Sequence, residues 1–128
     1  MSFESIVLCR LDELSEGQAR GFDPLQRGKD SVFAVRSNGQ LRVYLNSCPH
    51  LDVPMQYRKD RFLSADGQMI VCYAHGAQFR IDDGECVYGP CLGQRLTLLE
   101  HSQEQGWLTL NVAQLKRIEV SRLAIDRI

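Results

Sequence analysis

Turn-forming dipeptides recur along this chain and separate short apolar runs. They are Asn38-Gly39, Asp66-Gly67, Asp83-Gly84 and Gln105-Gly106. Asn-Gly and Asp-Gly are strong hairpin signals because both of their residues tolerate a positive φ. Short strands separated by turns about every 8–12 residues are typical of a small antiparallel sandwich or barrel. The sequence therefore predicts an all-β fold.

The apolar runs between these turns predict the strands. They cover residues 32–36, 41–45, 69–73, 78–81, 85–88, 96–99 and 107–110. In the second run, apolar side chains at every other position alternate with Arg42 and Tyr44, which predicts a strand with one buried face. Residues 6–11 suit an edge strand, and residues 17–28 are expected to form a loop. The tail, residues 112–128, is expected to contain a short helix, although 118–120 also suits a strand.

Length and charge limit the classes of function. A chain of 128 residues predicts a single domain, residues 1–128. The net charge of −1 argues against nucleic acid as a partner, because phosphate binding needs a surplus of cationic side chains. No run approaches the roughly 18 apolar residues of a membrane span, and the first residues carry no signal-peptide pattern. We therefore expect a cytoplasmic protein that does not associate with a membrane.

Cysteines and histidines are paired in two short motifs. Cys48 and His50 form a C-x-H motif, and Cys72 and His75 form a C-x-x-H motif. Each motif follows a predicted strand. The chain has five cysteines, and a reducing compartment disfavours structural disulfides, so a metal site or a reactive thiol is the better interpretation. The two loops are expected to converge on one site.

The mixture and order of these residues favour one kind of metal centre. Thiolate and imidazole together suit an iron–sulfur cluster, zinc or copper. A zinc finger usually places its two cysteines in one turn and its two histidines in another. Here each loop carries one of each, so each loop can give a thiolate to one iron and an imidazole to the other. Zinc, and buried side chains without a ligand role, stay open as alternatives.

The sequence around these motifs resembles the Rieske 2Fe–2S family. The pattern C-P-H at residues 48–50, followed by C-x-x-H-G-x-x-F at 72–79, carries the resemblance. Residues 83–86 and the Gly-Pro pair at 89–90 are similar to the stretch whose turn covers the cluster in that family. The resemblance spans about residues 30–112. It implies a Rieske fold, in which an antiparallel β-sandwich or barrel base carries an inserted cluster-binding subdomain at about residues 46–93.

The resemblance also implies a cofactor and its ligands. Cys48 and Cys72 are expected to bind one iron of a single 2Fe–2S cluster. His50 and His75 then bind the other iron, which lies near the surface in this family, so electrons leave there. Two ferric ions, two sulfides and two thiolates are neutral together, whereas four thiolates leave a net negative charge. Histidine ligation therefore raises the reduction potential.

Departures from the family pattern point to a low-potential member. Respiratory members carry two further cysteines that bridge the ligand loops, and here residues 51–53 and Ala74 offer no such pair. High-potential members place a serine and a tyrosine hydroxyl against cluster sulfurs, where this chain has Ala77 and Phe79. Fewer hydrogen bonds to sulfur lower the potential. The chain is thus similar to ferredoxins of bacterial oxygenase systems, with an extra surface loop expected at residues 56–68.

The resemblance implies an electron carrier rather than an enzyme. A Rieske oxygenase adds a mononuclear iron held by two histidines and a carboxylate, and only His101 remains here after the cluster is ligated. We expect one-electron transfer from a reductase to an oxygenase or another redox partner. The alternative is a small redox or regulatory subunit of a fixed complex, similar to the small subunit of nitrite reductase.

The remaining candidate residues are expected to be structural. Cys9, Cys86 and Cys91 are interpreted as small core residues, although the last two bracket the Gly-Pro turn and a reversible disulfide stays open. His101 is expected to lie in a solvated turn, and Trp107 to pack at the start of a strand.

Overall fold

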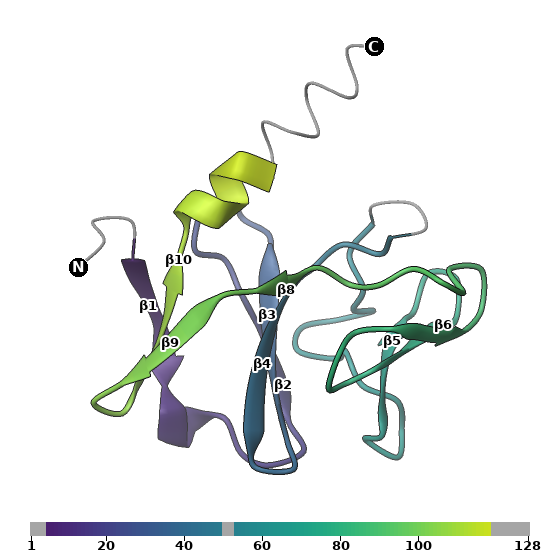
Figure 1. Ribbon diagram of the computed structural model, residues 1–128, viewed down its shortest axis with the longest axis horizontal. Coiled ribbons are helices and arrows are strands. Elements are labelled where there is room, and N and C mark those ends of the chain that lie inside the picture. The colour runs from purple at the N-terminus through teal and green to yellow at the C-terminus, as the bar shows by residue number, and fades with distance from the viewer. Residues whose placement is uncertain (1–4, 50–52, 119–128) are drawn as a thin grey trace.

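The computed structural model describes residues 5–49 and 53–118, and these residues are nearly all β (Figure 1). The strands are β1 (Ser5–Arg10), β2 (Ala19–Phe22), β3 (Val32–Ser37), β4 (Gln40–Leu45), β5 (Met69–Cys72), β6 (Ala77–Arg80), β7 (Cys86–Tyr88), β8 (Leu98–Leu99), β9 (His101–Glu104) and β10 (Trp107–Asn111). A 3-10 turn, η1 (Leu11–Glu13), follows β1, and residues 113–118 form a helix. The predicted all-β class is confirmed.

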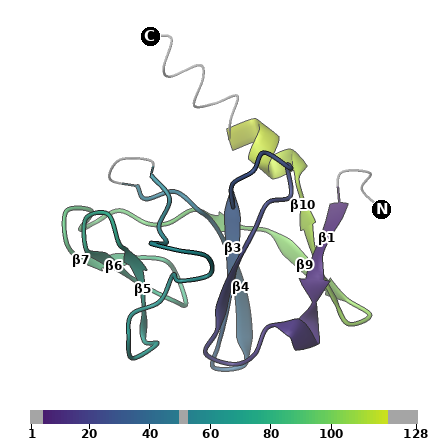
Figure 2. The ribbon, with the colours of Figure 1, turned by 180° about the vertical axis from the view of Figure 1, so that it is seen from behind.

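The described strands form three antiparallel sheets. Their strand orders are β1-β10-β9, β2-β3-β4-β8 and β5-β6-β7. Figures 1 and 2 show the sheet that contains β3 and β4 between the other two. The β5-β6-β7 sheet is formed by the chain between β4 and β8, so this sheet interrupts the central one in sequence.

The β3–β4 hairpin is buried on both faces. Val32 and Ala34 of β3 belong to the core shared with β1 and β10, whereas Phe33 and Val35 belong to the core shared with β5 and β6. Successive side chains of a strand point to opposite faces of the sheet, so one strand lines both cores. The predicted Asn38-Gly39 turn joins β3 to β4, with both residues at positive φ.

Strand β4 departs from the expected half-buried pattern. Tyr44 was expected to face away from the core, but it is fully buried, and its hydroxyl donates to the carbonyl oxygen of Ile81 at 2.7 Å. The Nε–H of Arg42 donates to the Asp82 carbonyl oxygen at 3.0 Å. Burial raises the pKa of Tyr44 to about 12. Both side chains contact the turn after β6, because the third sheet covers this face of β4.

Residues 56–68 are more than the surface loop that the sequence predicts. The Phe62 ring is fully buried and stacks on Phe33 with ring centroids 4.3 Å apart. The Lys59 ammonium donates to the carbonyl oxygen of Gly21 at 2.8 Å, and the Gly21 amide donates to the Asp60 carboxylate at 2.8 Å. Burial of one aromatic ring and these backbone contacts to β2 fix the segment on the base of the fold.

Three local predictions need correction. Residues 17–28, expected as a loop, contain β2, which pairs with β3 through Gly21 opposite Phe33. His101 lies in β9 rather than in a turn, since the Gln105-Gly106 turn closes a β9–β10 hairpin. The predicted strand at 96–99 is reduced to β8, Leu98–Leu99. β2 and β9 gain their hydrogen bonds from β3 and β10, whereas β8 pairs with β4 at only two positions, and the local apolar pattern reveals none of this pairing.

The helix expected in the tail is confirmed at residues 113–118, and residues 119–128 lie outside the described part of the chain. Leu115 is buried in the base core. Among the described residues, no helix is both long and apolar enough to cross a membrane.

The Tyr44 hydroxyl joins two sheets, so removing it is expected to weaken the fold. Tyr44→Phe leaves the buried Ile81 carbonyl without its donor, which costs about 1–3 kcal/mol of unfolding free energy. Urea unfolding of the purified protein measures this loss. Tyr88→Phe is the matched control, because Tyr88 is 64% exposed, and an equal loss in both variants contradicts the expectation.

Candidate metal centre

Hydrogen bonds join the two ends of the loop that carries Cys48, which is the first of the two predicted ligand loops. Cys48 follows β4, and its amide donates to the carbonyl oxygen of Val53 at 2.9 Å. The side chain of Asn46 accepts from the Met55 amide at 2.8 Å and donates to Gln56 Oε1 at 2.7 Å. Both ends of the loop are therefore fixed, and Cys48 is fully buried.

The second ligand loop is the tight connection between β5 and β6. Cys72 is the last residue of β5 and pairs with Ala77, the first residue of β6. The amides of His75 and Gly76 donate to the Cys72 carbonyl oxygen at 3.3 and 2.7 Å. Gly76 has φ +74°, a left-handed conformation that a residue with a side chain rarely adopts. This turn buries Cys72 and leaves His75 exposed.

Backbone hydrogen bonds bring the two loops together, as the sequence predicts. The Tyr73 amide donates to the Met55 carbonyl oxygen at 2.9 Å, so the start of the second loop pairs with the end of the first. Burial and a hydrogen bond with the Cys48 thiol raise the pKa of the Cys72 thiol. Amide hydrogen bonds from Ala74 and His75 act in the opposite direction and lower that pKa.

The structure describes three of the four predicted ligands. It brings the thiols of Cys48 and Cys72 together in one buried cluster of side chains, with His75 in the turn that follows Cys72. His50 lies outside the described residues. Among the side chains that are described, no group of three or more His, Cys, Asp or Glu residues surrounds a single metal position.

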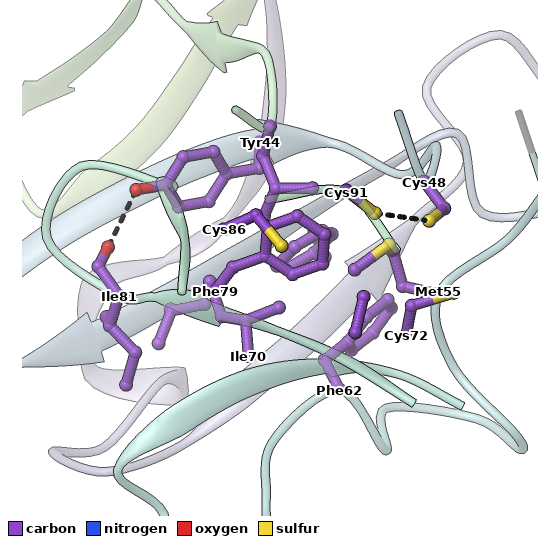
Figure 3. Close-up of a cluster of buried hydrophobic side chains, with 14 residues drawn as sticks. Tyr44, Cys48, Met55, Phe62, Ile70, Cys72, Phe79, Ile81, Cys86 and Cys91 are labelled. Carbon is purple, nitrogen blue, oxygen red and sulfur yellow. Dashed lines mark hydrogen bonds between the residues drawn. The ribbon is translucent and has the colours of Figure 1, made fainter. Parts of the chain in front are cut away.

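A third loop packs against the two ligand loops. Gly89, with φ +103°, lies against β6 so closely that a Cβ there is 2.8 Å from the Cα atom of Ala77. Cys91 follows in the same loop, and its Sγ atom is 3.8 Å from that of Cys48 (Figure 3). Burial, together with the Cys48 and Cys86 thiols, raises the pKa of Cys91 to about 12. The Gly-Pro turn thus covers the thiol pair.

The cysteines outside the predicted ligand set are all buried and free, as expected for core residues. Cys9 lies in the base core, away from the ligand loops. Cys86 donates its S–H to the carbonyl oxygen of Tyr88 at 3.3 Å. The contact between Cys91 and Cys48 is what sequence reasoning missed. Its signal was the position of Cys91 directly after the Gly-Pro pair.

Exposed aromatic and apolar side chains surround these loops. Tyr73 is 39% exposed, its ring lies edge-on to Tyr57 with centroids 4.6 Å apart, and its hydroxyl donates to the Leu63 carbonyl oxygen. Tyr88 and Leu92, from the third loop, are about two-thirds exposed.

The other two candidate residues lie away from the ligand loops. His101 pairs with Leu110 across the β9–β10 hairpin, and burial lowers its pKa. Trp107 is 41% exposed, and the guanidinium of Arg10 lies 5.2 Å from the centroid of its ring.

The donor set fits an iron–sulfur cluster. Two buried thiols converge from separate loops, and the amides of Ala74 and His75 lower the pKa of the Cys72 thiol. Hydrogen bonds to sulfur are one of the means by which proteins set the potential of such clusters. Burial disfavours a thiolate without a counter-charge, and the ferric ions of a bound cluster would supply that charge.

Comparison with known families identifies the class of protein. The family model described as Rieske [2Fe-2S] domain matches residues 4–115, so this chain belongs to the Rieske [2Fe-2S] domain family. The cofactor of that family is one Rieske-type 2Fe–2S cluster, in agreement with the sequence prediction. Among curated proteins, none matches the sequence significantly.

Solved structures with the same fold include several ferredoxins. The ferredoxin of Sphingomonas yanoikuyae B1 has a TM-score of 0.64 at 21% identity, over 84% of this chain and 97% of that one. The ferredoxin of carbazole 1,9a-dioxygenase from Nocardioides aromaticivorans IC177 has a TM-score of 0.62 at 20% identity, over 83% and 95%. A chain from the complex of reduced oxygenase and oxidized ferredoxin in carbazole 1,9a-dioxygenase has a TM-score of 0.65 at 19% identity, over 86% and 94%. The predicted Rieske fold is thereby confirmed.

The close packing of Gly89 on β6 is expected to make this position intolerant of a side chain. Gly89→Ala adds a contact with the Ala77 backbone to the strain of a positive φ, whereas Gly93→Ala, at φ +87°, meets open space. We expect Gly93→Ala to cost about 1–2 kcal/mol and Gly89→Ala at least about 1 kcal/mol more. Thermal and urea unfolding measure both, and equal losses contradict this account of the third loop.

Proposed function

We propose that this protein carries single electrons on a Rieske-type 2Fe–2S cluster held by its two ligand loops. Cys48 and Cys72 hold one iron, and His50 and His75 hold the other. The observation that carries the proposal is the convergence of two buried thiols from loops joined by the hydrogen bond between Tyr73 and Met55. Residues 46–93 then act as the cluster-binding unit.

Each part of the site has a separate task. When bound, the cluster supplies a one-electron redox couple. Burial of Cys48 and Cys72 keeps water from the sulfur ligands, and the amides of Ala74 and His75 stabilise negative charge on the Cys72 sulfur. His75 is exposed, so its imidazole lies where a redox partner approaches.

An oxygenase is the partner class that we propose, with a reductase as the electron donor. Support comes from the similar ferredoxins, one of which belongs to carbazole 1,9a-dioxygenase. The exposed side chains of Tyr73, Tyr88 and Leu92, beside the ligand loops, provide an apolar surface for a transient contact. These ferredoxin matches favour a carrier over a fixed subunit of the nitrite reductase type.

The location that we propose is the cytoplasm. Support comes from the five cysteines, which are all free, because a reducing compartment keeps thiols from forming disulfides.

Absorption and EPR spectra of the purified protein, before and after dithionite, test the function. We expect a brown protein whose reduced form gives the low mean g value of a histidine-ligated 2Fe–2S centre. A colourless protein with bound zinc, and no signal after anaerobic reconstitution with iron and sulfide, contradicts the proposal.

Replacing a histidine ligand by cysteine is expected to lower the reduction potential. His75→Cys or His50→Cys adds a negative thiolate to the cluster, which moves the potential toward the value of about −400 mV typical of four-thiolate clusters. Protein-film voltammetry and EPR measure the change. His101→Cys is the matched control, because His101 lies in β9, away from the ligand loops. This substitution is expected to leave the potential and the spectrum unchanged. An unchanged potential in the His75 variant contradicts its ligand role.

A further inference from the structure

Cys91 contacts the ligand loops although the proposed function gives it no role. Its side chain is fully buried, and its Sγ atom lies 3.8 Å from the Sγ atom of Cys48, within the range of a sulfur hydrogen bond. The two residues are 43 positions apart in sequence. The amide of Gln94 donates to the Cys91 carbonyl oxygen at 2.8 Å, which helps to fix the position of this thiol.

The proposed ligation decides the direction of this hydrogen bond. Between two thiols, either sulfur can be the donor. A cysteine that ligates iron has lost its proton and can only accept. We propose that Cys91 donates its S–H to the sulfur of Cys48 and thereby raises the reduction potential of the cluster. This inference rests on the proposed function, and Cys91 acts through Cys48 rather than by binding iron.

Such a donor compensates for hydroxyl groups that the chain lacks. Ala77 and Phe79 occupy the positions at which the sequence pattern of high-potential relatives has hydroxyl side chains, and both are fully buried. Hydrogen bonds to sulfur withdraw negative charge and make reduction easier. The proposed donor to Cys48 is a side chain of the third loop, which neither ligand loop supplies.

Cys9 provides a matched control in the base core. It is also buried and free, and it packs with residues of β10, away from the ligand loops. Cys86 is unsuitable as a control, because its thiol interacts with that of Cys91. Removing the Cys9 thiol deletes a buried sulfur of the same size and leaves the surroundings of Cys91 and Cys48 unchanged.

The test compares Cys91→Ala, Cys91→Ser and Cys9→Ala in the cluster-loaded protein. Protein-film voltammetry gives the potential, and resonance Raman spectroscopy gives the stretching frequencies of the iron–thiolate bonds. Cys91→Ala is expected to keep its iron and sulfide content while the equilibrium constant for reduction falls several-fold and the iron–thiolate stretch shifts. Cys91→Ser keeps a proton donor, so its shift is expected to be smaller. Cys9→Ala is expected to match the unchanged protein.

Several results overturn the inference. One is an unchanged or higher potential in Cys91→Ala. Another is an equal decrease in Cys91→Ala and Cys91→Ser, which assigns the effect to volume rather than to the S–H group. A third is loss of the cluster from both variants, which makes Cys91 a ligand or a structural residue. If the unchanged protein itself binds no 2Fe–2S cluster, the proposed function fails first, and iron and sulfide analysis detects that separately.

Discussion

The double burial of the β3–β4 hairpin is the constraint on which the rest of the structure depends. Because side chains alternate along a strand, Val32 and Ala34 pack on one core while Phe33 and Val35 pack on the other. One core stabilises the base of the fold, and the other holds the sheet that carries the second ligand loop. A polar residue at any of these positions would leave an unsatisfied group in one of the two cores.

Backbone hydrogen bonds and a few side-chain contacts join the parts of the proposed metal centre. The amide of Tyr73 links the two ligand loops through Met55, and the close packing of Gly89 on Ala77 adds the third loop. These contacts come from three segments that are far apart in sequence, and they fix the backbone on either side of Cys48 and Cys72. Under the proposed function, a site arranged in this way would need little structural change on electron transfer.

Local patterns predicted the features of the fold that local physics determines. The Asn38-Gly39 turn and the two strands that it joins follow from the conformations of adjacent residues. The two Cys/His motifs predict a metal site because thiolate and imidazole in paired loops suit few metals, and the four ligands stay a prediction. The burial of Tyr44 and Phe62, and the approach of Cys91 to Cys48, depend on segments tens of residues away. No periodicity encodes such contacts, so only the three-dimensional structure reveals them.

The thiols and the imidazole of the proposed site are buried to different extents, which decides the side at which an electron would enter and leave. Cys48 and Cys72 are fully buried, whereas His75 is exposed. Reduction adds one negative charge, and a buried region disfavours added charge more than a hydrated surface does. Under the proposed ligation, the histidine side therefore accommodates the electron at lower cost, where solvent stabilises it. The same side faces an approaching partner, so the thiolates can stay shielded while the electron enters and leaves. Under this proposal, shielding of the sulfur ligands and access for the electron are compatible in one site.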